Sequence, residues 1–185
     1  MPAHIIGLVG RQGSGKGTVA SYLVEQHNAV VFRFSSFLND VLDLLSIPRS
    51  RTNLIKLSTS LREAFGEDAL SYAVVKAATT SENPIIVVDG IRRIEDIAAL
   101  ESLPNFTLIE IAVPEEIRFE RMKNRGEKSG EANMTWEKFK ADEEAPTEIT
   151  IPQVAERATI HLDNTGTPEA LIDQLKTLLT TLGIE

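Results

Sequence analysis

The sequence contains no cysteine. Disulfide bonds, thiol nucleophiles and cysteine-based zinc sites are therefore excluded. It has only three histidines, His4, His27 and His161, and their positions do not match the spacing of metal ligands. No apolar stretch reaches the about 20 residues that a membrane-spanning helix needs, and no secretory signal is expected before the first predicted strand. These absences favour a cytoplasmic protein without a zinc site or a membrane span.

Positive charge is also scarce. Lysine and arginine together number 19 against 27 acidic residues, so the formal net charge is −8. A protein that binds nucleic acid is more often basic. The 185 residues, 42 % of them hydrophobic, suit one domain with a core. We therefore expect a single domain over residues 1–185, a monomer or small homo-oligomer, that acts on small molecules and binds neither nucleic acid nor membrane.

One glycine-rich stretch near the start dominates the functional reading. It follows the apolar run 5–9 and precedes a helical pattern at 19–24, which is the context of a phosphate-binding P-loop. Glycines let successive backbone N–H groups point inward, and the helix N-terminus adds positive potential. A lysine supplies a charge for the outer phosphates. The expected ATP-binding residues are Gly10, Arg11, Gln12, Gly13, Ser14, Gly15, Lys16, Gly17 and Thr18.

Gly17 departs from the general P-loop pattern. The residue after the lysine is normally Ser or Thr, whose hydroxyl binds Mg²⁺. In this chain Gly17 takes that place and Thr18 follows it. We therefore expect Thr18 to be only a weak metal contact, with Mg²⁺ held mainly by phosphates and water.

Strands alternate with helices along the chain. Apolar or β-branched runs predict strands at 4–9, 29–34, 85–88, 106–113 and 158–162. The pattern predicts an α/β, three-layer P-loop NTPase fold with a five-stranded parallel sheet. Helical spacing and caps predict helices at 16–26, 37–45 (capped by Ser35-Ser36), 52–65, 68–79, 94–103, 114–124, 135–144 and 168–182, with an irregular connection bounded by Pro146 and Pro152.

The predicted elements divide the domain into a core and two additions. The core comprises 1–35, 81–124 and 145–185. A mostly helical insertion at 36–80 has room to bind an acceptor. The polar, glycine-containing stretch that starts at residue 125 opens a short lid, 125–144.

Ligands of parallel sheets bind at the carboxyl ends of the strands. That rule brings the segments 35–36, 89–93 and 164–167 together with the P-loop at one edge of the sheet, Ser35 among them. Asp89 can orient waters on Mg²⁺ or bind an arginine, although Asp-Gly is also a common turn pair. Arg92 suits an acceptor phosphate. Arg93 is the alternative acceptor arginine, unless it is exposed or paired with Asp96 or Asp89.

Three arginines, Arg118, Arg121 and Arg125, share one face of a predicted helix at spacings i, i+3 and i+7. We expect Arg121 and Arg125 to close over the transferred phosphate, because phosphoryl transfer needs its negative charge neutralised and water excluded. The alternative is a solvated basic face balanced by neighbouring glutamates.

Two further segments have an open interpretation. Asn164 and Gly166 follow the last strand and either present backbone groups to a base or form only a turn. Arg62, in the insertion, either faces the acceptor or pairs with Glu63, Glu67 or another surface acid.

These segments resemble nucleoside monophosphate kinases in their order along the chain. More closely, the chain resembles a small archaeal-type family of P-loop kinases grouped with adenylate kinase and dephospho-coenzyme A kinase. The stretches that carry the resemblance are the P-loop, Leu61-Arg62-Glu63-x-Phe65-Gly66-x-Asp68-Ala69, Val88-Asp89-Gly90-Ile91-Arg92, Arg118-Phe119-Glu120-Arg121, Trp136-Glu137-x-Phe139, Asp142-Glu143 and Asn164-x-Gly166.

The resemblance implies ATP as donor, Mg²⁺, and a small phosphorylated acceptor, most simply a nucleoside monophosphate such as AMP or a deoxynucleotide. Such a phosphate needs no general base, because it is already ionised. A hydroxyl acceptor, as in dephospho-coenzyme A, would need a carboxylate base, and the sequence offers none beyond Asp89. A nucleotide-dependent switch without an acceptor is the rival class.

Overall fold

Five parallel strands form the centre of the molecule in a computed structural model that describes residues 4–125 and 134–184, with Arg125 described by its backbone only. Every neighbouring pair of these strands is parallel, and their order across the sheet is β2-β3-β1-β4-β5. The predicted α/β architecture is confirmed. The strands are β1 His4–Val9, β2 Val30–Arg33, β3 Ile85–Asp89, β4 Phe106–Ala112 and β5 Ile160–Asp163.

The central strand β1 is covered on both faces. Its successive side chains point to opposite sides, so Ile5 and Val9 belong to one buried cluster and Ile6 and Leu8 to another. A strand without a solvent face needs apolar residues at every position. This requirement explains the continuous apolar runs at β1 and β3.

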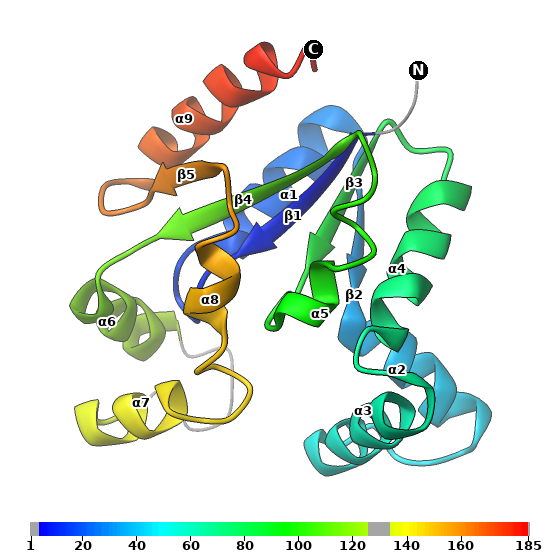
Figure 1. Cartoon of the computed structure of the whole chain (residues 1–185). Helices are drawn as coiled ribbons and strands as arrows, with labels where there is room; N and C mark the ends of the chain where they lie inside the picture. The colour runs from blue at the N-terminus through cyan, green and yellow to red at the C-terminus, as the bar shows by residue number, and fades with distance from the viewer. Residues whose placement is uncertain (1–3, 126–133, 185) are drawn as a thin grey trace.

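Helices cover both faces of the sheet (Figure 1). One face packs against α1 Lys16–His27 and α9 Pro168–Thr181. The other packs against α2 Phe34–Leu44, α4 Ala69–Thr80, α5 Ile94–Ile97 and α8 Ile151–Ala155, with α3 Arg51–Phe65 adding partly buried leucines. The helices α6 Glu115–Arg125 and α7 Trp136–Glu143 enclose a small cluster around Met122, Met134 and Phe139.

Two predicted helix ends and one predicted irregular connection are wrong. The helix α2 begins at Phe34, so Ser35 and Ser36 lie in its first turn, and Arg33 takes the N-cap position without a side-chain cap. The helix α5 ends at Ile97 instead of 103. The helix α8 falls in the expected irregular connection. It has only five residues, too few for a periodic pattern, and it tolerates Pro152 because a helix start needs no hydrogen bond there.

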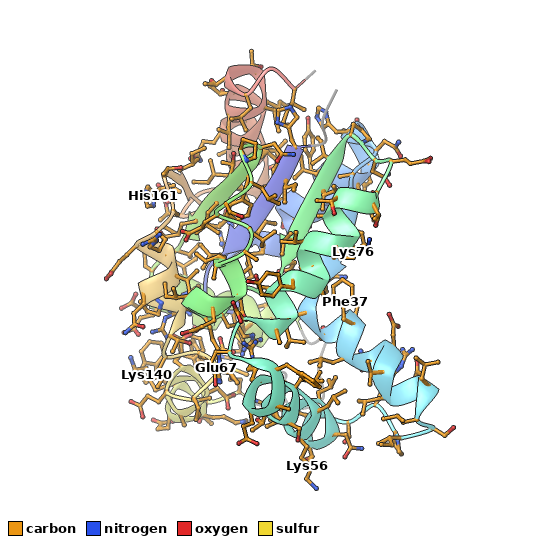
Figure 2. All side chains as sticks on the ribbon, turned by 45° about the vertical axis from the view of Figure 1, so that its right-hand side comes forward. Phe37, Lys56, Glu67, Lys76, Lys140 and His161 are labelled. Atoms are coloured by element: carbon orange, nitrogen blue, oxygen red, sulfur yellow. The ribbon has the colours of Figure 1, made fainter. Side chains whose placement is uncertain are left out.

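The carboxyl edge of the sheet lies between two helical groups. In Figure 1, α2 and α3 extend below one side of this edge, and α6 and α7 below the other. Figure 2 shows that the exposed side chains of Lys56 and Lys76 point away from the molecule, whereas the space between helices and sheet is filled. No helix in the described ranges is long and apolar enough to cross a membrane.

Candidate active site

A cleft with a volume of about 1140 Å³ opens at the carboxyl edge of the sheet. It brings together the four segments that the sequence analysis expected to meet: the P-loop, the start of α2, the end of β3 and the turn after β5. Its lining residues are Gln12, Gly13, Ser14, Gly15, Lys16, Gly17, Thr18, Ser21, Arg33, Ser35, Asp89, Gly90, Arg92, Arg121, Met122, Asn164, Gly166, Pro168 and Leu171.

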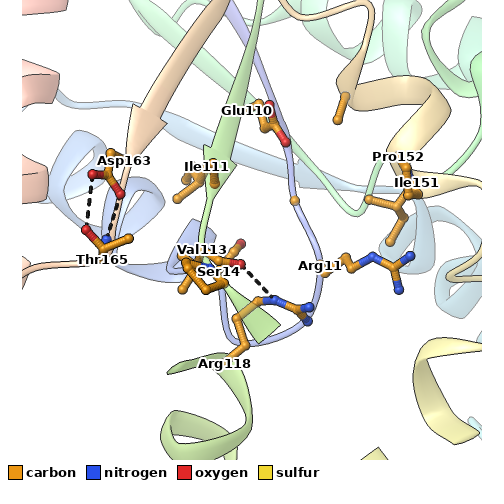
Figure 3. A pocket seen from close by; sticks show the side chains of 14 residues that line it. Arg11, Ser14, Glu110, Ile111, Val113, Arg118, Ile151, Pro152, Asp163 and Thr165 are labelled. Carbon is orange, nitrogen blue, oxygen red and sulfur yellow. Dashed lines mark hydrogen bonds between the residues drawn. The ribbon is translucent and has the colours of Figure 1, made fainter. Parts of the chain in front are cut away.

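A smaller cavity of about 490 Å³ adjoins the same loop (Figure 3). Gly10, Arg11 and Ser14 line it together with the ends of β4 and β5 and with α8. Ser14 lines both cavities, so the loop forms a wall between them. The Ser14 hydroxyl is buried and has no hydrogen-bond partner within the described residues.

The P-loop geometry depends on glycine at Gly15. This residue has a left-handed backbone, with φ +104°, and immediately precedes α1. A Cβ atom placed on it would lie 2.2 Å from Nδ2 of Asn164. At Gly17, in contrast, nothing lies within 4 Å of an added Cβ. Gly15 is therefore required by the loop's shape, whereas Gly17 is sterically free to be another residue.

Lys16 reaches across its own loop. Its Nζ donates hydrogen bonds to the carbonyl oxygens of Gly10 and of Arg11, the latter at 3.1 Å. Burial lowers the pKa of Lys16 to about 8, although the carboxylates of Asp89 and Glu148 oppose this shift. A phosphate placed beside Nζ would favour the charged amine, because opposite charges raise the pKa of a lysine.

Asn164 binds the backbone of the P-loop. Its side chain is buried, and Nδ2 donates to the backbone oxygen of Ser14 at 2.7 Å. The residue also pairs with the sheet, because its backbone N–H donates to Ala112 O. From the sequence alone, residues 164–166 were either a turn that binds a base or only a turn. The structure adds that the Asn164 side chain connects the P-loop to the end of β5.

Arg121 lies over the turn that follows β5. Its Nη2 donates to Gly166 O at 3.2 Å, and its buried Nη1 has no hydrogen-bond partner in the described ranges. Arg121 therefore lines the cleft from the α6 side. The side chain of Arg125, the expected second lid arginine, lies outside the described part of the chain.

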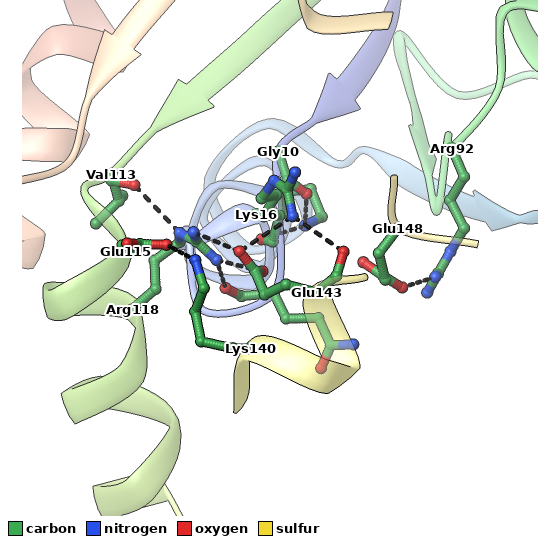
Figure 4. Close-up of polar contacts among 11 residues, drawn as sticks. Gly10, Lys16, Arg92, Val113, Glu115, Arg118, Lys140, Glu143 and Glu148 are labelled. Carbon is green, nitrogen blue, oxygen red and sulfur yellow. Dashed lines mark hydrogen bonds and ion pairs between the residues drawn. The ribbon is translucent and has the colours of Figure 1, made fainter. Parts of the chain in front are cut away.

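Arg118 does not belong to an exposed basic face, which was the alternative interpretation of the three arginines. It is only 5 % exposed, and its two Nη atoms bind the Glu143 carboxylate at 2.6 and 2.8 Å. Glu143 also pairs with Arg11 at 3.0 Å (Figure 4). One buried carboxylate thus joins α7 to α6 and to the P-loop. The sequence analysis missed this role of Glu143, whose only signal was a place in the Asp142-Glu143 stretch.

Asp89 has both carboxylate oxygens engaged at the end of β3. Oδ1 accepts from the Gly90 N–H at 2.8 Å, and Oδ2 accepts from Nε of Arg33 at 3.1 Å. Thr18 and Ser35 are exposed and line the same cleft. The described residues hold no cluster of three metal-ligating side chains. Any Mg²⁺ here would depend on phosphate and water, and the oxygen donors of Asp89 and Thr18 suit that arrangement.

Arg92 lines the cleft and forms an ion pair with Glu148. Its Nη1 also donates to Thr147 O at 3.3 Å, and its backbone oxygen accepts from the Thr150 hydroxyl at 2.7 Å. Glu148 is 2 % exposed. No sequence signal pointed to Glu148, because its partner lies 56 residues away and Glu148 lies within the irregular connection bounded by Pro146 and Pro152.

Arg62 and Arg93 are not among the residues that line the cleft. Arg62 is 8 % exposed; it binds Oδ1 of Asp96 at 2.7 Å and also the Glu67 backbone oxygen. Asp96 is itself buried, so the partner is not the surface acid that the sequence analysis considered. Arg93 pairs with Glu67 at 3.2 Å. Oδ2 of Asp96 accepts hydrogen bonds from the backbone N–H groups of both Arg92 and Arg93, so Asp96 connects Arg62 of α3 to the segment that follows β3.

The sequence model of one family, described as "AAA domain", matches residues 9–140. The chain belongs to this family. It is also 27 % identical over 180 residues, 97 % of each chain, to a protein of Methanoculleus marisnigri named "UPF0200 protein". A protein of the same name from Methanosarcina acetivorans is 31 % identical over 124 residues, 66 % of each chain. The expected kinship with archaeal P-loop kinase-like proteins is thereby confirmed.

Solved structures share the fold. TT1252 from Thermus thermophilus superposes with a TM-score of 0.62 at 22 % identity, covering 98 % of this chain and 99 % of its own. Shikimate kinase from Aquifex aeolicus reaches 0.55 at 19 % identity, covering 95 % and 96 %. At these identities the likeness establishes a P-loop kinase-like architecture.

Proposed function

We propose that this protein is an ATP-dependent kinase that transfers the γ-phosphate of ATP to a small acceptor. The observation that carries the proposal is the composition of one cleft. The P-loop residues 12–18, with Lys16 among them, line it on one side, and Asp89 and Arg92 at the end of β3 line it on another. Phosphoryl transfer needs both a phosphate cradle and an adjoining acceptor site.

The donor half would use the P-loop, Lys16 and Arg121. The loop N–H groups and Lys16 would bind the β- and γ-phosphates, and Arg121 would close over the transferred group together with Arg125. Asn164 and Gly166 would hold the loop and border the nucleotide. Mg²⁺ would neutralise the phosphates, with Asp89 acting through water and Thr18 as a weak contact. ATP is the donor that the resemblance favours over GTP.

A nucleoside monophosphate is the first acceptor candidate, with AMP or a deoxynucleotide as the simplest cases. Its phosphate would lie beside Arg92, with Ser35 on the border of the site. The helices α2, α3 and α4 would provide the acceptor-binding insertion, and the segment 125–144 the lid. Arg62 and Arg93 would then act through Asp96, by holding the backbone of Arg92 in place.

A hydroxyl compound is the second candidate, favoured by the buried carboxylate of Glu148 beside Arg92. Two of the similar folds are named shikimate kinase and sugar kinase, and their namesake substrates offer hydroxyl groups. This candidate includes dephospho-coenzyme A.

A switch that hydrolyses ATP without an acceptor is the rival function. Such a switch would leave Arg92 without an acceptor to bind.

An acceptor screen with Mg-ATP tests the proposal. The screen covers the nucleoside and deoxynucleoside monophosphates, dephospho-coenzyme A and shikimate, with ADP and phosphorylated product measured by mass spectrometry. We expect one acceptor to give stoichiometric ADP and product, and Lys16→Ala to abolish both. The exposed Lys176→Ala variant, on α9 and outside the cleft lining, is the matched control and should keep the rate. ADP formation that no acceptor accelerates would contradict the proposal.

A further inference from the structure

Glu148 is a buried carboxylate with one oxygen still free. Its Oε1 pairs with Arg92, whereas Oε2 is buried and has no hydrogen-bond partner within the described residues. A buried polar atom without a partner costs free energy, and in a native structure it indicates a missing ligand or a chemical role. The side chain extends between Arg92 and the P-loop residues Gly10 and Lys16 (Figure 4). Glu148 does not itself line the cleft, but its partner Arg92 does, and its negative charge acts on Lys16 of the P-loop. The free oxygen therefore lies behind the cleft wall, next to Arg92.

The charges on the acceptor side of the cleft are already balanced. Arg92 pairs with Glu148, and Arg33 pairs with Asp89. On the donor side, Lys16 and Arg121 bind only backbone carbonyl oxygens among the described residues. Uncompensated positive charge is thus concentrated where ATP would bind. A second phosphate on the acceptor side would have to compete with a carboxylate for Arg33 or for Arg92.

We infer that the acceptor's reacting group is a hydroxyl and that Glu148 is the general base that takes its proton. This inference rests on the proposed kinase function and names the class of acceptor. A hydroxyl is a weak nucleophile, and a positioned carboxylate that removes its proton contributes about 10²–10⁴-fold in rate. Arg92 would hold the Glu148 carboxylate in place, and a bound acceptor that draws the Arg92 side chain aside would expose the free oxygen.

The step balances in atoms and charge. The acceptor oxygen forms a bond to the γ-phosphorus of ATP, and the bond between that phosphorus and the β,γ-bridging oxygen breaks. The bridging oxygen leaves with ADP. The hydroxyl proton passes to Oε2 of Glu148 and then to water when the products leave. The products are a phosphate monoester, ADP and one proton.

Glu148→Gln is the decisive variant, because it keeps the side chain's shape and removes its basicity. Glu156→Gln, an exposed carboxylate eight residues later, is the matched control. We measure ADP formation from Mg-ATP with water alone, with dephospho-coenzyme A and with AMP, and Mg-ATP binding by calorimetry. We expect Glu148→Gln to lower ADP formation with water, and product formation with any hydroxyl acceptor, at least tenfold, with ATP affinity within twofold of the wild type. Glu156→Gln should match the wild type.

A second comparison separates a base from a residue that only positions Arg92. If Glu148 acts only by holding Arg92, adding Glu148→Gln to Arg92→Gln should change nothing further. A base predicts a further loss of at least tenfold in the double variant, and an unchanged rate would overturn it.

The outcomes also separate this inference from the proposed function. Phosphorylation of AMP at the same rate in the wild type and in Glu148→Gln would overturn the hydroxyl acceptor and leave the kinase standing. A wild-type protein that binds Mg-ATP and forms no ADP under any condition would overturn both.

Discussion

Substituting Gly15 by alanine tests the P-loop geometry most sharply, because a control lies two residues away. Gly15 has φ +104°, and a Cβ there would lie 2.2 Å from Asn164 Nδ2. Gly17 is exposed, belongs to the first turn of α1 and has nothing within 4 Å of an added Cβ. The same chemical change should therefore have opposite effects at the two positions.

The magnitude follows from two separate costs at Gly15. Holding a non-glycine residue in a disfavoured backbone region costs about 1–3 kcal/mol. Displacing the buried Asn164 amide from Ser14 O costs about another 1–3 kcal/mol. We expect Gly15→Ala to lower the free energy of unfolding by about 2–6 kcal/mol in total. Gly17→Ala should change it by about 0 to 1 kcal/mol in the stabilising direction, since alanine favours a helix more than glycine does.

Urea unfolding followed by circular dichroism measures the free energy of unfolding of both variants. The slope of this free energy against urea concentration checks that the denatured state is unchanged. Calorimetry with Mg-ATP should show lost binding for Gly15→Ala and retained binding for Gly17→Ala. The reasoning is refuted if Gly15→Ala costs less than about 1 kcal/mol, the lower bound for such backbone strain. It is also refuted if both variants lose the same stability.

Three further predictions concern buried charges. The pKa of Lys16 is lowered from 10.5 to about 8 in the folded state, so the unfolded chain binds more protons between these two pH values. The free energy of unfolding of the wild type should therefore rise with pH in this range relative to that of Lys16→Met. A difference between the two proteins in urea unfolding that stays the same at every pH would contradict this. Asp96→Asn leaves buried Arg62 uncompensated and should cost about 3–5 kcal/mol, whereas exposed Asp173→Asn should cost less than about 0.5 kcal/mol; equal costs would refute the buried pair. Glu143→Gln weakens the ion pairs of α7 with Arg11 and Arg118. Trypsin should therefore cleave the Glu143→Gln variant at least fivefold faster than the Asp173→Asn variant, and equal cleavage rates would refute this role of Glu143.

The sheet and the P-loop could be predicted from the sequence because their signals are local. The apolar run of β1 and the spaced glycines that follow it are adjacent in the chain, and the fold requires both. The prediction of β1 at 4–9 matches the structure. The failures also have local causes. The short helix α8 lacks a periodic pattern, and Ser35 was read as a cap although α2 begins one residue earlier.

The site was less predictable because its partners are distant in the sequence. Glu148 meets Arg92 across 56 residues, and Asn164 meets Ser14 across 150. Arg62 had an equally plausible surface partner, and only the structure, which brings Arg62 of α3 to α5, shows that it binds buried Asp96. Sequence spacing identifies which residues share a helix face or a strand end. It does not reveal which carboxylate each arginine meets.

The central claim is phosphoryl transfer from ATP to a small molecule in the cleft beside Lys16. The most direct measurement follows the γ-phosphate itself, by incubating the protein with γ-labelled ATP, Mg²⁺ and the acceptor mixture of the screen. We predict that most of the label enters one organic product, with an equal amount of ADP, and that Lys16→Ala yields none. Label recovered only as inorganic phosphate, or equal transfer by Lys16→Ala, would contradict the account.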